Sequence, residues 1–450
     1  MKHLTVLSLV SASLALGGCA TLSKDAGLGD VQKITQQHIP QQAVWPRTEA
    51  EQSEVAARVS ELLQEPRMDA DCAVQIALLN NRGLQVKFYE LGVSEADLVQ
   101  AGRLPNPKFD MRYAKSGGEF TIEQALTFNI FALVTMPKMQ EIERQHVEQT
   151  KQAVAAEVLR LAHQTRLAYF NAVAATELVR YSEQVKESAE ASAELARRMV
   201  QAGNWSKLEQ AREQGFYADA ALDAAQAKSK QVSANEALSR LLGVSADQLK
   251  LEQRLPDLPD TFSEFDTQTV FEQRLDLRAM RLETETLAKQ LGLTKTTRFI
   301  NVLELGPSRV LEGNRSNNYK YGLDLSFELP LFDWGDARVA RAEAIYMQAV
   351  NRTAQLASNA QSEIREAYSR YRATYDVAKH YRDEIVPLRK KILQENQLRY
   401  NGMLISPFEL FVDARTQVMS VNSYIESLRE FWLAETALQM MLTGSGKDMQ

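Results

Sequence analysis

Residues 319–329 read Tyr-Lys-Tyr-Gly-Leu-Asp-Leu-Ser-Phe-Glu-Leu and place an apolar side chain at every second position. Residues 108–113, Lys-Phe-Asp-Met-Arg-Tyr, repeat the pattern with charged side chains between the apolar ones. Because successive side chains of a strand point to opposite faces, each stretch predicts a strand with one apolar and one polar face. We expect strands at residues 105–115, 119–134, 298–310 and 318–332.

The apolar face of these strands could lie against lipid or against a second protein layer. An antiparallel sheet with one wet face is the commoner arrangement in general. This chain offers only the four predicted strands and no evident second layer, which favours strands of a membrane barrel. Four strands cannot close a barrel, since the smallest bacterial ones have about eight. Three chains together would supply an allowed, even number of strands, so the strand count predicts a trimer if the sheet lies in lipid.

The composition of the 450-residue chain excludes several other classes of protein. A mean hydropathy of −0.32 with 24% charged residues argues against a bundle of transmembrane helices, each of which needs about 20 apolar residues. The balance of 52 Lys and Arg against 58 Asp and Glu, without a basic block, argues against a nucleic-acid partner. Two cysteines and five histidines are too few for a disulfide framework or a rich metal site. Only 12 Pro and 20 Gly leave few helix breakers, so helices can be long.

Two segments free of glycine, residues 138–202 and 337–401, predict very long helices of 65 residues each. At 1.5 Å per residue, each would extend roughly 100 Å. Alanine is abundant in both and large apolar residues are sparse, which suits close coiled-coil packing. We expect a kink or a helix end at Pro387 and a reversal into a hairpin at Gly203 and Gly402.

The chain is internally duplicated. Residues 166–169, Arg-Leu-Ala-Tyr, recur as Arg-Glu-Ala-Tyr at 365–368, an offset of 199. Residues 211–214, Ala-Arg-Glu-Gln, match Ala-Arg-Thr-Gln at 414–417 with an offset of 203. The larger offset predicts about one extra helical turn in the second copy, just after Gly402. We expect each copy to begin with a shorter helix, at residues 69–101 and 268–293.

The N-terminus predicts export. Lys2 precedes an apolar run, residues 4–16, that is too short to span a bilayer, which is typical of a secretory signal. Residues 16–19, Leu-Gly-Gly-Cys, resemble the bacterial lipobox, which implies acylation of Cys19 and stable membrane anchoring. The alternative is a plain secreted protein with an unrelated cysteine. We expect the chain to divide into a lipoprotein signal peptide (1–18), a lipid-anchored extended leader (19–66), a first repeat (67–254), a linker (255–267), a second repeat (268–444) and a tail (445–450).

Several motifs carry a family resemblance. Residues 325–335, Leu-Ser-Phe-Glu-Leu-Pro-Leu-Phe-Asp-Trp-Gly, are the most specific of them. Residues 73–81, Ala-Val-Gln-Ile-Ala-Leu-Leu-Asn-Asn, form a second motif together with Leu84. Further motifs are Leu104-Pro-Asn-Pro107, Arg274-x-Asp276-Leu-Arg-Ala279, and Arg338 with Ala342. Over about residues 67–444 the sequence resembles the TolC-like outer membrane efflux proteins, in particular their lipid-anchored branch that serves drug and heavy-metal pumps. It departs from the family pattern where Arg82-Gly83 replaces the usual proline.

The resemblance implies a mainly α-helical protein with a membrane β-barrel part. Three copies would form a homotrimer with a twelve-stranded barrel in the outer membrane, continued in the periplasm by an α-barrel of long antiparallel coiled-coil helices. Such a protein is a passive efflux conduit rather than an enzyme, and it takes no cofactor. Its implied partners are a periplasmic adaptor (membrane fusion) protein, an inner-membrane efflux pump and outer-membrane lipid.

The resemblance also suggests functional residues near the hairpin reversals. Glu409 and Asp413 match carboxylates that the family keeps one turn apart, and a threefold ring of them would form a periplasmic gate. A solvated helix face is the alternative interpretation of these two residues. The hairpin tips are candidate adaptor contacts, although turn geometry explains the glycines equally well. The tip residues are Gly203, Asn204, Ser206, Gly402, Leu404 and Ser406. Arg212 and Arg415 are expected to pair with nearby acids at the surface, where each pair contributes about 0–1 kcal/mol.

No catalytic constellation is evident in the sequence. It has no HExxH, GxSxG, Walker or CxxC motif, and His146, His163 and His380 stand alone in predicted helices. The pair Met440-Met441 is interpreted as packing, so no metal ligand is assigned. The main alternative function is a lipid-anchored periplasmic coiled-coil scaffold without a channel. An envelope enzyme is disfavoured because the catalytic residues it would need are missing.

Overall fold

The computed structural model describes residues 22–260, 274–300, 302–313 and 319–445. The expected signal peptide (1–18), the acylation site Cys19 and the tail after Ser445 lie outside these residues, as do the second half of the linker and residues 268–273 of the second repeat. The chain divides into two compact units. The first contains Met1–Val31, Phe88–Val154 and Asp276–Ala357, and the second contains Gln32–Lys87, Ala155–Leu275 and Ser358–Gln450.

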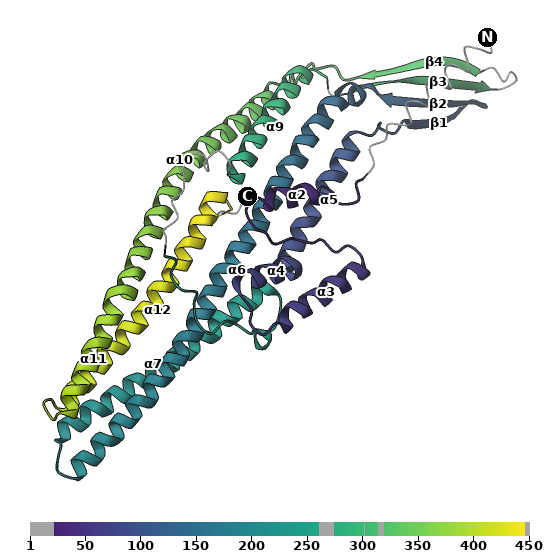
Figure 1. The fold of residues 1–450 in the computed structure, drawn as a ribbon. Coiled ribbons are helices and arrows are strands. Elements are labelled where there is room, and N and C mark those ends of the chain that lie inside the picture. The colour runs from purple at the N-terminus through teal and green to yellow at the C-terminus, as the bar shows by residue number, and fades with distance from the viewer. Residues whose placement is uncertain (1–21, 261–273, 301, 314–318, 446–450) are drawn as a thin grey trace. The chain divides into compact units, whose positions relative to one another are not determined.

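Most of the described chain is helical, and the remainder includes one sheet (Figure 1). The strands are β1 (Lys108–Ser116), β2 (Glu119–Asn129), β3 (Leu303–Gly313) and β4 (Tyr319–Phe327). The helices are α2 (Leu28–Thr35), α3 (Glu49–Gln64), α4 (Ala70–Asn80), α5 (Arg82–Ala101), α6 (Ile130–Gln201), α7 (Lys207–Leu242), η2 (Ala246–Gln248), α9 (Leu275–Thr297), α10 (Asp336–His380), η3 (Tyr381–Ile385), α11 (Val386–Asn401) and α12 (Pro407–Thr443).

The strands form one antiparallel sheet in the order β1-β2-β3-β4, which confirms the four predicted strands. Its register aligns Met111, Gln124, Arg309 and Tyr321 in one row across the sheet. We call the face that carries this row the apolar face. Alternation places on it Phe109, Met111, Tyr113 and Lys115 of β1, Phe120, Ile122, Gln124, Leu126 and Phe128 of β2, Leu303, Leu305, Pro307, Arg309, Leu311 and Gly313 of β3, and Tyr319, Tyr321, Leu323, Leu325 and Phe327 of β4.

The opposite, polar face carries three ion pairs between strands. Two of them join adjacent strands, Arg112 to Glu123 and Lys320 to Glu312, and the third joins Lys108 of β1 to Glu304 of β3 across β2. The edge strands β1 and β4 are exposed along their whole length in the single chain. Exposed edges carry unpaired backbone groups, so this sheet is an incomplete structure that a further strand can extend on either side.

Helix α6 begins earlier than the sequence predicts. The strand expected over 119–134 ends at Asn129, and the next residues already belong to α6. The Oδ1 atom of Asn129 accepts a hydrogen bond from the backbone N–H of Ala132 at 2.8 Å, which is a helix-capping contact. Pro137 lies inside this helix and does not mark its start. The apolar residues at 130–134 therefore continue a helix rather than a strand.

Two side chains of the second unit contact the carbonyl ends of α7 and α12. The expected helix over 69–101 is broken at Asn81, and Nδ2 of Asn81 donates to the carbonyl oxygen of Leu241 near the end of α7 at 2.9 Å. In the second repeat, Nη1 of Arg274 donates to the carbonyl oxygen of Met441 near the end of α12 at 2.8 Å. Both contacts satisfy carbonyl groups that the end of a helix leaves free. The two contacts are alike in that each lies near the carbonyl end of a long helix, although Asn81 follows α4 and Arg274 precedes α9.

An aromatic cluster forms part of the core of the second unit. Phe170 of α6 stacks on Trp432 of α12, with ring centroids 5.3 Å apart. The adjacent Phe431 packs against Tyr371 and Tyr375 of α10, at 5.5 and 5.8 Å. Large aromatic side chains bury much area, so this cluster holds α12 to α6 and α10.

The leader is not extended throughout, which corrects the expectation for 19–66. It contains α2 and α3. Thr48 starts α3 through a capping box, in which its side chain accepts from the N–H of Glu51 and the Glu51 carboxylate accepts from the N–H of Thr48. The polar composition hid these helices, because only Val59 and Leu62 of α3 are buried.

The second long helical segment is interrupted where a proline predicts it. One π-helical turn, η3, separates α10 from α11, and Pro387 lies in the first turn of α11. A proline removes a backbone donor, and a wider turn accommodates that loss. Within the described ranges, no helix is both long enough and apolar enough to cross a membrane.

Candidate functional site

The two hairpin reversals lie at the same end of the second unit (Figure 1). At the first, Gly203 has a left-handed φ of +77°, and the N–H of Asn204 donates to the carbonyl oxygen of Met199 at 2.9 Å. At the second, Met403 takes the left-handed position with φ +59°, and the N–H of Leu404 donates to the carbonyl oxygen of Arg399 at 2.8 Å. Both are the Schellman type of helix end.

The reversals have equal length, which corrects the predicted extra turn. Gly402 has a φ of −82°, so the structural equivalent of Gly203 is Met403, at an offset of 200. Ser206 and Ser406 are the N-caps of α7 and α12, again at an offset of 200. The alignment through 211–214 and 414–417 is therefore a sequence coincidence rather than the structural correspondence.

The expected adaptor-contact residues are all exposed at these tips. They are Gly203, Asn204, Ser206, Gly402, Leu404 and Ser406. Leu404 is 72% exposed and its neighbour Met403 is 92% exposed. Large apolar side chains held this far into solvent at a rigid turn offer area that a partner can bury.

The two predicted gate residues occupy different environments on α12. Glu409 is exposed in the first turn, where its N–H donates to Oγ of Ser406 at 3.3 Å. Asp413 is half-buried and accepts a hydrogen bond from Nδ2 of Asn396 on α11. The same offset of 200 makes Glu209 and Glu213 of α7 their counterparts. The acid seven residues after each N-cap therefore contacts the helix that precedes its hairpin.

That counterpart, Glu213, is the residue that sequence reasoning missed. Its side chain is 0% exposed, and Ser192 of α6 donates from Oγ to its Oε2 at 2.7 Å. Arg415 of α12 donates from Nη2 to its Oε1 at 2.7 Å. We call this contact the Glu213–Arg415 bridge. It is a buried ion pair between helices, and not the surface pair that the sequence led us to expect for Arg415.

Both arginines of this region also lie over aromatic rings. The guanidinium of Arg415 is 4.1 Å from the ring centre of Phe216, and that of Arg212 is 5.2 Å from the ring centre of Phe408. Cation–π contacts of this kind are attractive and become stronger away from water. The Nε of Arg415 is buried and makes no hydrogen bond to a described residue. The guanidinium of Arg415 is therefore hydrogen-bonded to Glu213 through Nη2, whereas its buried Nε has no hydrogen-bond partner among the described residues.

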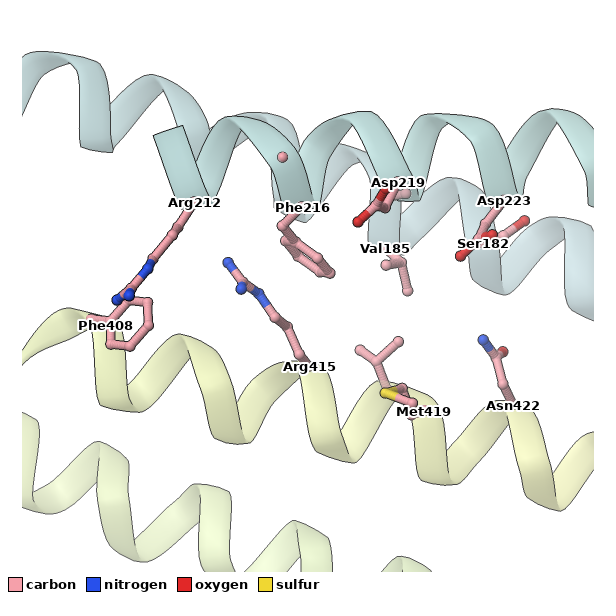
Figure 2. A pocket seen from close by; sticks show the side chains of 13 residues that line it. Ser182, Val185, Arg212, Phe216, Asp219, Asp223, Phe408, Arg415, Met419 and Asn422 are labelled. Atoms are coloured by element: carbon pink, nitrogen blue, oxygen red, sulfur yellow. The ribbon is translucent and has the colours of Figure 1, made fainter. Parts of the chain in front are cut away.

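A pocket of about 510 Å³ lies beside the bridge, between α12 and the pair α6 and α7 (Figure 2). Figure 2 shows Arg415 reaching from α12 toward Phe216 and Arg212 reaching from α7 toward Phe408. A second cavity of about 380 Å³ shares Val185, Phe216, Arg415 and Val418 with it, and a third of about 260 Å³ shares Ser182, Asp223 and Asn422 with the first. The three cavities form a groove along this side of α12.

One stripe of α12 lines the groove with incompletely bonded polar atoms. Nε of Arg415, Oδ1 of Asn422 and Nε of Arg429 are all buried without a hydrogen-bond partner among the described residues. Their spacing of seven residues puts them on one face of the helix. Apolar packing is incomplete along this stripe, and α12 is held to α6 and α7 by the bridge, the two cation–π contacts and the Phe170–Trp432 stack. The start of α12 is therefore restrained by one ion pair and two cation–π contacts, with the groove beside them.

The lone histidines differ in environment. His146 and His380 are exposed, near Glu143 and Glu384 respectively. His163 is buried in α6, and neither ring nitrogen has a hydrogen-bond partner among the described residues. Burial, and then the positive charges of Arg166 and His38, lower the pKa of His163 to about 4. No group of three or more metal-ligating side chains occurs in the part of the chain that the structure describes.

Comparisons with known proteins identify the fold. No protein-family model matches the chain, and neither does any curated protein sequence. Among solved structures, the CmeC outer membrane channel of Campylobacter jejuni matches with a TM-score of 0.70 at 19% identity, over 87% of this chain and 88% of CmeC. The outer membrane protein VceC of Vibrio cholerae matches with a TM-score of 0.69 at 15% identity, over 89% of this chain and 99% of VceC. The open-state MtrE outer membrane channel of Neisseria gonorrhoeae matches with a TM-score of 0.69 at 17% identity, over 84% of this chain and 89% of MtrE.

At these identities the matches show a shared fold. The chain shares with these channels an architecture of long helices joined to a four-stranded antiparallel sheet, which confirms the single-chain part of the predicted fold.

Proposed function

We propose that this protein is the outer-membrane channel of a tripartite efflux system. The observation that carries the proposal is the two-faced sheet, because it presents an apolar face and two unpaired edges within a fold shared with outer membrane channels. A sheet with an apolar outer face and a polar inner face suits a water-filled barrel in lipid.

The open edges account for the proposed homotrimer. Pairing β4 of one copy with β1 of the next would satisfy both edges, and closure abolishes them altogether. Three chains with four strands each give the even number that bacterial barrels use. The long helices would then continue the conduit as an α-barrel in the periplasm, in two repeats over 67–254 and 268–444.

The membrane anchor and the partners follow from the same proposal. Cys19 would carry the acyl chains that hold the leader on the membrane, in addition to the barrel. The exposed tips of the two hairpins, including Leu404, would contact a periplasmic adaptor, which links the channel to an inner-membrane pump. The channel is passive, and the pump supplies direction and cargo.

The hairpin ends would also open and close the conduit. In a trimer, Glu409 and Asp413 would form a threefold ring of carboxylates that repels anions. The Glu213–Arg415 bridge would hold α12 against α6 and α7 in the described conformation, with the groove beside it leaving room for movement. Breaking the bridge would release α12 and widen the periplasmic entrance.

Membrane extraction tests the proposal against the scaffold alternative. The variant Cys19→Ser removes the lipid anchor and leaves the sheet intact. A channel should resist extraction by carbonate and by urea even without its acyl chains, whereas a periplasmic scaffold should be released into the soluble fraction. Release of the variant as a monomer that needs no detergent would contradict the proposed function.

A further inference from the structure

Three polar side chains interrupt the apolar face of the sheet. Apart from tyrosine hydroxyls, the described residues of this face are apolar or glycine except for Lys115, Gln124 and Arg309. No carboxylate lies on this face among the described strand residues, because the acids of all four strands alternate onto the polar face. The apolar face therefore carries two positive charges without a negative one.

Lys115 lies at one end of the sheet, and Arg309 lies nearer to that end of β3 than to the other, in the row of Gln124 at the middle of β2. Lys115 is next to the last residue of β1, and Arg309 is four residues before the end of β3. The β1–β2 turn, Gly117-Gly118, is at this end, with φ values of +59° and +91°. The helices α5, α6, α9 and α10 all join the strands at the opposite end. If the helices extend into the periplasm, the cations lie on the side of the outer leaflet.

Arg309 is held in place by neutral neighbours. Its Nε donates to Oε1 of Gln124 at 2.5 Å, and its guanidinium lies 5.2 Å from the ring centre of Tyr319. Tyr321, in the same row, is 80% exposed, and Tyr113 is 60% exposed. The two terminal amino groups of Arg309 make no hydrogen bond to a described residue. The side chain is therefore oriented through Nε while its paired donors remain available.

Placing the charged side chains of Lys115 and Arg309 against lipid would be energetically unfavourable unless an anion were bound to them. A cation on the lipid face is strongly unfavourable at the bilayer centre, and the penalty falls toward the interface. Exposed tyrosines are typical of that interface. Terminal guanidinium nitrogens bind phosphate in a two-pronged geometry, which a neutral glutamine cannot replace. The cations are exposed, tyrosines lie near them, and no carboxylate of the described strands lies on this face to neutralise them. The phosphate of a lipid headgroup would supply the anion that this arrangement needs.

We propose that Arg309, with Lys115 as a second cation, binds the phosphorylated headgroup of an outer-leaflet lipid at the barrel surface. By strand geometry, the Cα atoms of the two residues are roughly 16 Å apart, since they are separated by two strands and about four residues. They therefore contact separate phosphates rather than one. This inference rests on the proposed function, because it requires the apolar face to lie in the outer membrane.

Native mass spectrometry of the full-length trimer in detergent tests the proposal. The probes are diphosphorylated lipid A and the same lipid without its phosphates. We expect Arg309→Gln to bind diphosphorylated lipid A at least tenfold more weakly than the unsubstituted protein, because a charge-assisted contact is lost. Arg309→Lys keeps the charge but loses the two-pronged geometry, so its binding should fall several-fold. Lys320→Gln, on the polar face, is the matched control and should bind normally.

Two results would overturn the proposal. One is equal binding of diphosphorylated lipid A by the unsubstituted protein and by Arg309→Gln, or by Arg309→Lys if the glutamine variant does not assemble. The other is equal binding of the lipid without phosphates, which would mean that acyl packing alone holds it. A protein that never enters membranes contradicts the proposed function as well. Normal channel conductance together with unchanged lipid binding in Arg309→Gln contradicts this inference alone.

Discussion

Arg415 of α12 donates a hydrogen bond from Nη2 to Oε1 of Glu213 on α7 at 2.7 Å, and this carboxylate has no exposed surface. The carboxylate also accepts from Ser192, so three helices meet at one acid. Removing one partner of a buried pair leaves the other uncompensated, which costs about 3–5 kcal/mol. Arg415 is 23% exposed, so we place the cost at the lower end of this range.

The bridge predicts that Glu213→Gln loosens the start of α12. Because 1.4 kcal/mol is a factor of ten, amide hydrogen exchange around residues 408–419 should rise by at least tenfold. Glu209→Gln is the matched control, since Glu209 lies on the same helix, is only half-buried, and caps its first turn without contacting α12 through an ion pair. Replacing both partners in Glu213→Leu/Arg415→Met should restore slow exchange, because an apolar pair leaves no buried charge. Equal exchange in Glu213→Gln and Glu209→Gln would show that the bridge restrains nothing.

The proposed ring of Glu409 and Asp413 carboxylates predicts how cations act on the proposed conduit. In planar bilayers, block by a trivalent cation applied from the hairpin side should weaken at least tenfold in Glu409→Ala/Asp413→Ala, because the attracting charges are gone. Glu54→Ala, an exposed acid on α3, is the control and should be blocked normally. Unchanged block in the double variant would remove Glu409 and Asp413 from the gate.

The two hairpin turns predict opposite effects of matched substitutions. Met403 is held at φ +59°, a conformation that costs an L-residue roughly 1–2 kcal/mol. Met403→Gly should therefore raise the thermal unfolding midpoint, and Gly203→Ala should lower it, because Gly203 has φ +77°. Circular dichroism on heating measures both. A lower midpoint for Met403→Gly would mean that the contacts of the Met403 side chain stabilise the protein by more than its left-handed backbone conformation costs.

His163 predicts a loss of stability in acid. Its pKa of about 4 in the folded state lies below the ordinary value of 6.5, so the unfolded chain binds a proton first as the pH falls. The contribution of His163 is present above pH 6.5 and is lost between pH 6.5 and about 4, by about 3 kcal/mol over that window. Denaturant titrations at several pH values should show this slope in the unsubstituted protein and in His146→Gln. The dependence of the unfolding free energy on pH should be weaker in His163→Leu. An unchanged dependence in that variant would assign the loss of stability to other titrating groups.

The regular parts of the fold were predictable from local pattern. Alternation between residues 319 and 329 gave the strand and its two faces, since side-chain direction in a strand depends only on position. The long helices and the interruption near Pro387 followed from the distribution of helix breakers. The ends of elements were less predictable, because Asn129 ends β2 through a side-chain contact that no periodicity reveals.

The candidate site was only partly predictable, for a physical reason. Glu213 looks like any acid on a polar helix, and its burial depends on α6 and α12 approaching from distant parts of the sequence. The predicted internal duplication of the sequence offers a way to recognise Glu213. Aligning the N-caps Ser206 and Ser406, instead of the glycines, puts Glu213 opposite Asp413 and would have identified it. Burial of a charged residue is a tertiary property, whereas a capping serine can be recognised locally.

Conductance of the purified protein tests the central claim most directly. We predict that Cys19→Ser protein, reconstituted into planar bilayers at low concentration, produces discrete and uniform current steps, since three copies would close one water-filled barrel in the proposed trimer. Its step size should increase in Glu213→Gln, where α12 is released. A protein that leaves the bilayer current unchanged, while keeping its helical circular dichroism and remaining monomeric, would contradict the account.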